Sequence, residues 1–264
     1  MASVSASDEL LRSGDLDGAR AALIDTLKRA PADEPARMFL WQLMVVSGEW
    51  DKALTHLRTL ASMSAEAQML ATVYHQAIVA EKARLDAYAG RAPFTVLVSS
   101  SEWIDTLAAG LTALAAGRTE EGAGLRDQAF DAVGDTPGAI DDQTFVWIAD
   151  ADSRLGPCFE AIVAGRWGLV PFEAVAQIKT EGPQDLRDVV WLPAEMMLRS
   201  GQSAAALLPA RYPGSEALAP ALRLGRETVW NAGAAGDQPA GQRLWSTDGG
   251  LEVGVLDFRE LVMA

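Results

Sequence analysis

A short motif near the N-terminus repeats after 34 residues, and this spacing limits the possible folds more than any other feature of the chain. GDLDGA at residues 14–19 recurs as GEWDKA at residues 48–53, and Leu23 corresponds to Leu57 at the same offset. A period of 34 residues is typical of tetratricopeptide repeats, each of which is a pair of antiparallel helices. The spacing therefore predicts a helical-repeat array. Two unrelated helical hairpins are the alternative, because turns of glycine and an acidic residue are common between helices.

The residue types of this motif suit a turn between two helices. The first glycine allows the tight turn, the acidic residue after it can cap the next helix, and the alanine lets the helices approach closely. A third unit, GRTEEG at residues 117–122, is degenerate and lies 69 residues after Gly48, close to two periods. Residues 64–89 contain few helix breakers and are predicted to form one long helix, and another helix is expected over residues 101–116. Such a short array usually needs capping by another element.

The character of the chain changes at GDTPG, residues 134–138, which is a cluster of turn-forming residues. We predict a domain boundary there, with a helical tetratricopeptide-like domain over residues 1–134 and an α+β domain over residues 135–264. In the second part, short apolar runs alternate with turns. The clearest run covers residues 251–261, and the preceding turn TDGG predicts a β-hairpin. We therefore expect a two-domain α+β protein whose second domain has a mainly antiparallel sheet.

Composition excludes several classes of function. The formal net charge is −14 and is shared almost equally by the two halves, which argues against binding to nucleic acid or to anionic lipid. The sequence contains no apolar run of about 18 residues and no pattern of a secretory signal, so we expect neither a membrane span nor export. The single cysteine, Cys158, cannot form an intrachain disulfide, which agrees with a cytoplasmic location.

Common catalytic and cofactor motifs are absent from the sequence. Both histidines, His56 and His75, lie in the helical part, so a Ser–His–Asp or Cys–His site confined to the second part is excluded. The ligands of an ordinary zinc site are too few, and neither of the usual glycine-rich phosphate-binding loops occurs. We therefore expect no metal and no cofactor.

Carboxylates and arginines gather in three segments of the second part. They are Asp150, Asp152 and Arg154, then Asp185, Arg187 and Asp188, and finally Arg211 before a Pro-Gly turn. On a strand, Asp150 and Asp152 would share a face and could bind a cation or share a proton, and Arg211 could clamp a carboxylate. Structural ion pairs are favoured, because nothing in the spacing specifies a metal or a sugar site. An enzyme or a ligand-binding protein that uses these groups is the alternative.

Several separated segments resemble the ImpE/SciE family of type VI secretion accessory proteins, one branch of which is called TagJ. They are residues 147–157 (WIADADSRLGP), 165–172 (GRWGLVPF), 183–194 (PQDLRDVVWLPA), 211–216 (RYPGSE), 224–230 (LGRETVW) and 256–260 (LDFRE). The resemblance covers nearly the whole chain. It implies a tetratricopeptide-like α domain followed by an α+β domain. It also implies an adaptor without catalytic residues, which binds the N-terminal helix of the small sheath subunit and is linked indirectly to the ATPase that recycles the sheath.

The predicted architecture is compatible with such a role. Helical-repeat arrays offer concave grooves in which an amphipathic helix can dock, and an acidic adaptor favours a helix whose apolar face is flanked by Lys and Arg. As residues that line or support the groove, we predict Leu16, Leu23, Trp50, Leu57 and Tyr74. A general helical-repeat scaffold with several clients is a further alternative.

Overall fold

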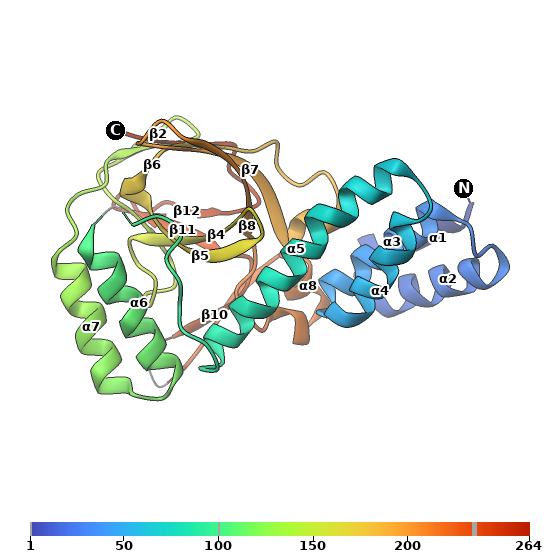
Figure 1. Cartoon of the computed structure of the whole chain (residues 1–264), viewed down its shortest axis with the longest axis horizontal. Coiled ribbons are helices and arrows are strands. Elements are labelled where there is room, and N and C mark those ends of the chain that lie inside the picture. The colour runs from blue at the N-terminus through green and yellow to red at the C-terminus, as the bar shows by residue number, and fades with distance from the viewer. Residues whose placement is uncertain (1, 100, 234–236) are drawn as a thin grey trace.

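The structure, a computed structural model, describes residues 2–99, 101–233 and 237–264. The helices are α1 (Ala2–Arg12), α2 (Leu16–Arg29), α3 (Glu34–Val46), α4 (Trp50–Ala61), α5 (Ala65–Tyr88), α6 (Glu102–Ala115), α7 (Thr119–Asp131) and the short α8 (Pro220–Arg223). Helices α1–α4 pack in chain order at one end of the molecule, and α5 runs from them to the sheet (Figure 1). The expected helical first part is thus present.

The repeated motif forms the turns that precede α2 and α4. Gly14 and Gly48 have φ angles of +84° and +68°, which glycine adopts without strain. The side chain of Asp15 caps α2 by accepting a hydrogen bond from the Gly18 amide at 2.8 Å. Glu49, at the equivalent position, makes no such cap and instead forms an ion pair with Arg20 of α2. The acidic residue therefore caps a helix in the first copy and joins the two copies in the second.

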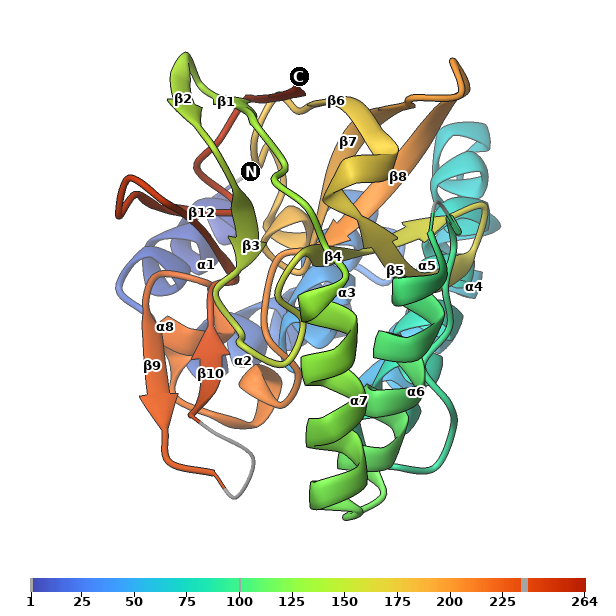
Figure 2. The same ribbon diagram turned by 90° about the vertical axis from the view of Figure 1, so that its left-hand side faces the viewer.

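The third, degenerate unit does not extend this array. Its residues form the turn between α6 and α7 and the start of α7. These two helices lie against each other (Figure 2) and at the opposite end of the molecule from α1–α4 (Figure 1). The long helix predicted over residues 64–89 is α5, and the Ser64 side chain caps it by accepting a hydrogen bond from the Ala67 amide at 3.1 Å. This single helix separates the first two repeats from the third.

The second part of the chain forms a mainly antiparallel sheet, as predicted. Its strands are β1 (Gly138–Ile140), β2 (Gln143–Phe145), β3 (Ile148–Asp150), β4 (Cys158–Val163), β5 (Arg166–Pro171), β6 (Val175–Lys179), β7 (Trp191–Leu198), β8 (Ser203–Pro209), β9 (Thr228–Asn231), β10 (Gln238–Gly241), β11 (Leu244–Thr247), β12 (Glu252–Gly254) and β13 (Glu260–Met263). The main sheet has the order β2-β1-β13-β6-β7-β8-β4-β5, and β12-β11-β3 and β10-β9 form two smaller sheets.

The C-terminal run predicted as one strand is divided in two. Strands β11 and β12 pair across the TDGG turn, so the predicted hairpin is confirmed. After β12 the chain leaves this hairpin, and β13 enters the main sheet between β1 and β6. The break covers residues 255–259, where Val255 and Phe258 are buried in the core of the sheet domain.

Helices and strands share the first of two hydrophobic cores. Trp191 of β7 is fully buried, with its ring centroid 5.8 Å from that of Trp50 in α4 and 6.2 Å from that of Tyr74 in α5. Its indole nitrogen donates a hydrogen bond to Glu81 of α5 at 2.9 Å. A second core, on the other face of the sheet, contains Trp245 and other aromatic residues, including Phe159 of β4. The boundary at residue 134 stays a prediction, and the first core extends across it.

Two glycines of α7 provide a test of the packing between α6 and α7. A Cβ atom on Gly122 would lie 2.6 Å from Cγ of Leu114 and 2.8 Å from the Gly110 carbonyl oxygen, whereas one on Gly124 would meet nothing within 4 Å. We expect Gly122→Ala to lower the free energy of unfolding by about 1–3 kcal/mol through overpacking. Gly124→Ala should raise it by about 0.5–1 kcal/mol through helix propensity. Urea denaturation of both variants checks this, and a stabilising Gly122→Ala would contradict the close packing.

Candidate functional site

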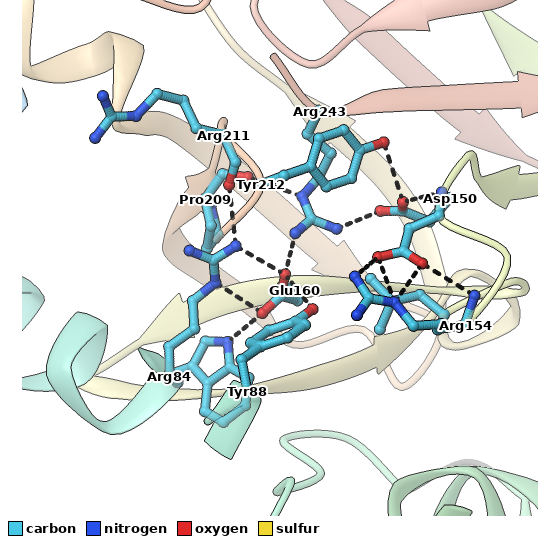
Figure 3. A network of polar contacts seen from close by, with 12 residues as sticks. Arg84, Tyr88, Asp150, Arg154, Glu160, Pro209, Arg211, Tyr212 and Arg243 are labelled. Carbon is cyan, nitrogen blue, oxygen red and sulfur yellow. Dashed lines mark hydrogen bonds and ion pairs between the residues drawn. The ribbon is translucent and has the colours of Figure 1, made fainter. Parts of the chain in front are cut away.

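The carboxylate of Glu160 is the centre of a buried network of charges. It accepts hydrogen bonds from Nε and Nη2 of Arg84 at 2.8 and 3.1 Å, from the Trp167 indole nitrogen at 2.8 Å and from the Tyr88 hydroxyl at 3.1 Å. It also forms an ion pair with Arg243 (Figure 3). Arg84 and Tyr88 come from α5, while Glu160 and Trp167 come from β4 and β5. The network therefore joins the long helix to the sheet.

The predicted pair Asp150 and Asp152 lies next to this centre. Arg243 bridges Glu160 to Asp150, and Asp152 pairs with Arg154, whose Nη2 is 2.6 Å from Oδ2 of Asp152 (Figure 3). The backbone amide of Asp152 also donates to Oδ1 of Asp150 at 2.9 Å. The two aspartates thus have different arginine partners, and neither carboxylate is left free to bind a cation.

Burial and pairing separate the pKa values of the two inner carboxyl groups. Burial raises the pKa of Asp150 to about 6, against the opposing effect of Arg243 and with a further upward contribution from Asp152. Burial also acts to raise the pKa of Glu160, but the charges of Arg243 and Arg84 outweigh it and lower that pKa to about 2. Because Glu160 has two arginines and Asp150 shares one, Glu160 keeps its charge to much lower pH.

The second predicted cluster forms a separate turn against the helices. In η2 (Leu186–Val189), Asp188 accepts hydrogen bonds from the backbone amides of Gln184 and Asp185, both at 2.8 Å. Arg187 pairs with Asp185, and its guanidinium lies 4.9 Å from the ring centroid of Tyr74 in α5. Within residues 2–99, 101–233 and 237–264, no ion pair joins this cluster to Asp150, Asp152 or Arg154. The two clusters therefore form separate sets of ion pairs.

Arg211 is buried and binds backbone carbonyls instead of a carboxylate. It donates to the carbonyl oxygen of Val46, the last residue of α3, at 3.0 Å and to that of Arg223. Its own carbonyl oxygen accepts a hydrogen bond from Arg84 at 2.9 Å. Burial lowers the pKa of Arg211 to about 10. A cation at the C-terminal end of a helix is stabilised by the helix dipole, so Arg211 fixes the end of α3 to the sheet domain.

The charged groups at the centre of this network are closed to solvent. Arg84, Glu160 and Arg243 are at most 2% exposed. Arg154, at the outer edge, lines a small cavity of about 220 Å³. The part of the chain that the structure describes contains no group of three His, Cys, Asp or Glu residues able to hold a metal ion. The geometry is that of an internal structural link.

Two apolar grooves flank α5 at the surface. The larger is a crevice of about 870 Å³ between α5 and strands β6, β7 and β8, and its lining includes Val73, Gln76 and Ala77 of α5, Pro193 of β7, and Ala205 and Leu207 of β8. The smaller has about 410 Å³ and lies between α4 and α5. Concave, mostly apolar surfaces of this size are where proteins bind other molecules.

Comparisons with known proteins identify the family. A tetratricopeptide-repeat model matches residues 10–73, and the family model described as ImpE protein matches residues 142–262. The chain is 43% identical over 256 residues to the "Type VI secretion system accessory component TagJ" of Pseudomonas aeruginosa. The matched region covers 97% of this chain and 90% of that protein. The chain belongs to the ImpE/TagJ-like family.

A solved structure shows the same fold as this ImpE/TagJ-like protein. The crystal structure of a Vibrio parahaemolyticus protein matches with a TM-score of 0.86 and 24% sequence identity, over 98% of this chain and 97% of that one. In the described part of the ImpE/TagJ-like chain, no helix is both long enough and apolar enough to cross a bilayer.

The predicted partner-binding residues of this ImpE/TagJ-like protein lie mostly inside it. Leu16, Leu23, Leu57 and Tyr74 are buried, and Trp50 is half-buried. Tyr74 lines the crevice and Leu57 lines the smaller groove, whereas neither groove includes the other three. A role in partner binding stays a prediction. Buried side chains can contribute to partner binding mainly by supporting the exposed residues that contact the partner.

Sequence reasoning missed the residues that hold the network together. Glu160 is a charged residue in the otherwise apolar strand CFEAIV, and Glu81 and Arg84 form an i, i+3 pair on α5. Both patterns were available signals, because a charge in an apolar strand needs a buried partner. Arg243 follows the strand QPAG and carries no comparable signal.

The first test of this network removes the charge at its centre. Glu160→Gln removes one of the two carboxylate partners of Arg84 and of Arg243, which keep Glu81 and Asp150. We expect the free energy of unfolding to fall by about 1.5–3 kcal/mol through the lost charge-assisted hydrogen bonds. Glu121→Gln removes one partner of the exposed Arg118–Glu121 pair and should change it by less than about 0.5 kcal/mol. Urea denaturation of the two variants measures the difference. Equal effects would show that the buried pairs contribute no more than a surface pair.

The second test uses pH and Asp150. A carboxyl group whose pKa is higher in the folded than in the unfolded state contributes stability that is present below the unfolded pKa and is lost as pH rises through the folded pKa. With a folded pKa of about 6 and an ordinary aspartate pKa of 3.8, the contribution of Asp150 should be lost between about pH 4 and pH 6. We expect the stability of the wild type relative to Asp150→Asn to be greater at pH 4 than at pH 7. Urea denaturation across this range measures it, and parallel pH profiles would contradict the raised pKa.

Proposed function

We propose that this protein is a non-enzymatic, cytoplasmic adaptor of a type VI secretion system that binds the N-terminal helix of the small sheath subunit. The observation that carries the proposal is the 43% identity, along 97% of the chain, to a protein named as an accessory component of that system. Through the sheath subunit, the adaptor is linked to sheath assembly or to the ATPase that recycles the sheath.

The state of the charged residues supports an adaptor over an enzyme. The carboxylates of Asp150, Asp152 and Glu160 are all paired with arginines inside the protein. A catalytic carboxylate needs access to a substrate, and the inner groups are covered by α5 and the strands. Glu160 also pairs with Arg84 of α5, so the network has a structural role, which is to hold α5 to the sheet.

The surface around α5 supports helix binding. Met69 and Val73 on α5 are 76% and 51% exposed, and the two apolar grooves lie on either side of this helix. An amphipathic helix can place apolar side chains at i, i+3, i+4 and i+7 into such grooves. The net charge of −14 favours a partner with Lys and Arg beside its apolar face.

Titration calorimetry tests the proposal. The purified full-length chain is titrated with a peptide of the N-terminal helix of the small sheath subunit encoded in the same genome, and a scrambled peptide serves as control. We expect saturable binding of the native peptide with a Kd of about 1 μM or tighter, which corresponds to a standard binding free energy of about −8 kcal/mol. No binding by a folded protein would contradict the proposal, and equal binding of both peptides would favour a general scaffold.

A further inference from the structure

The crevice beside α5 is present because α5 covers only part of one face of the main sheet. This helix packs on the face of β4 and β5, where Ile162 and Trp167 are buried. Further along the same face, Glu195 of β7 and Ser203 and Ala205 of β8 are exposed. The crevice of about 870 Å³ lies where α5 leaves the sheet. One part of this face is therefore covered by α5, and the neighbouring part is left uncovered.

We propose that this crevice is the docking site of one amphipathic helix with Lys or Arg beside its apolar face, which lies next to α5 on the outer face of β6, β7 and β8. The proposal rests on the adaptor function above and names the surface and the chemistry of the partner.

The pairing of the strands favours a helix as the occupant. Strand β7 pairs with β6 on one side and β8 on the other, and β8 also pairs with β4. Their backbone hydrogen bonds are used within the sheet, so an added strand would find no free edge here. A helix satisfies its own backbone groups, and helices are the elements that cover sheet faces.

The lining suits close approach of such a helix. The sheet side presents the compact side chains of Pro193 and Ala205, which are both exposed, and the α5 side presents Val73 and Ala77. Small residues let a helix backbone lie close to the strands, while its larger apolar side chains fill the space between the strands and α5. A helix with its side chains is about 10–12 Å across, which matches the layer that α5 occupies beside it.

Charge selects a basic partner at this position. Glu181 and Glu195 stand at the crevice, are exposed, and pair with no cation among the described residues. Lys179, the basic residue of the lining, is already paired with Glu260, with 3.3 Å between Nζ and Oε1. Lys or Arg residues along the docked helix would neutralise the two free carboxylates.

The smaller groove between α4 and α5 is less suitable for the same helix. Its volume is about half that of the crevice, and its lining includes Arg58 and His75 but no acidic residue. Arg58 forms no ion pair within the described ranges of the chain, so a basic helix would meet an unneutralised positive charge there. Size and charge therefore both favour the crevice.

Two substitutions on the same strand provide the test. Ala205 and Ser203 are both exposed and lie two residues apart on β8, so their side chains leave the same face of the sheet, but only Ala205 lines the crevice. Ala205→Trp should weaken binding of the sheath-subunit peptide by about tenfold or more, because the indole fills the space of an anchor side chain. Ser203→Trp should change it by less than about twofold. Thr72→Trp, in the smaller groove, tests the rival position.

A charge reversal adds a second readout. Glu195→Lys should weaken binding of the peptide and reduce the salt dependence of that binding. Glu120→Lys on α7 lies at an exposed site outside both grooves. It changes the net charge by the same amount and should affect binding much less. All variants are measured by calorimetry as full-length, folded protein, with the sheath-subunit peptide and with a designed Leu/Lys amphipathic helix of the same length.

The outcomes separate the docking site from the proposed function. If the sheath peptide binds and Ala205→Trp has no effect, or if Thr72→Trp alone blocks binding, the crevice is not the docking site, while the adaptor function stands. If only the designed helix binds the wild type and Ala205→Trp blocks it, the crevice stands and the sheath partner is overturned. Failure of both helices to bind the wild type overturns both.

Discussion

The buried negative charge of Glu160 is the constraint on which the joining of helices and sheet depends. An unpaired carboxylate in the interior is strongly unfavourable, so Arg84 from α5 and Arg243 from the segment between β10 and β11 must both be in place when β4 is covered. Apolar packing alone would tolerate small shifts of α5 over the sheet, whereas a set of directional hydrogen bonds does not. The network therefore fixes where α5 lies, and with it the width of the crevice between α5 and β8.

Helix α5 belongs to two structures at once. Its N-terminal half packs on α4 as the last helix of the short array, and its C-terminal half packs on β5. Arrays of few repeats need a cap, because the last helix otherwise exposes an apolar face. Here the sheet supplies the cap through Trp191, and Arg211 ties α3 to the same domain. The array is consequently held as one end of a single body.

Much of this architecture could be predicted from short-range patterns. The 34-residue spacing, the cap at Ser64 and the turn before β12 are local signals, and each marks a real helix or hairpin. The network could not be predicted in the same way, because Glu160 and Arg243 are 83 residues apart and sequence spacing does not encode such a pair. The sequence also did not reveal which faces of the helices are exposed to solvent. Leu57 and Tyr74 have the spacing of groove residues, but both are buried. Helix α4 packs on α5, and Tyr74 lies against Trp191 of β7. Helical periodicity alone does not show which neighbouring element covers a residue.

The position of β13 has a consequence for synthesis of the protein. This strand follows all the other strands of the main sheet in sequence, yet it lies between β1 and β6 and pairs with both. During translation, the β1–β2 hairpin has no neighbour to join until residues 260–263 have left the ribosome. The helices α1–α5 emerge much earlier and can fold locally, but the apolar face of α5 stays uncovered until the strands assemble. The nascent chain therefore passes through a stage with a formed array and an open sheet, in which it is most exposed to aggregation and to chaperones.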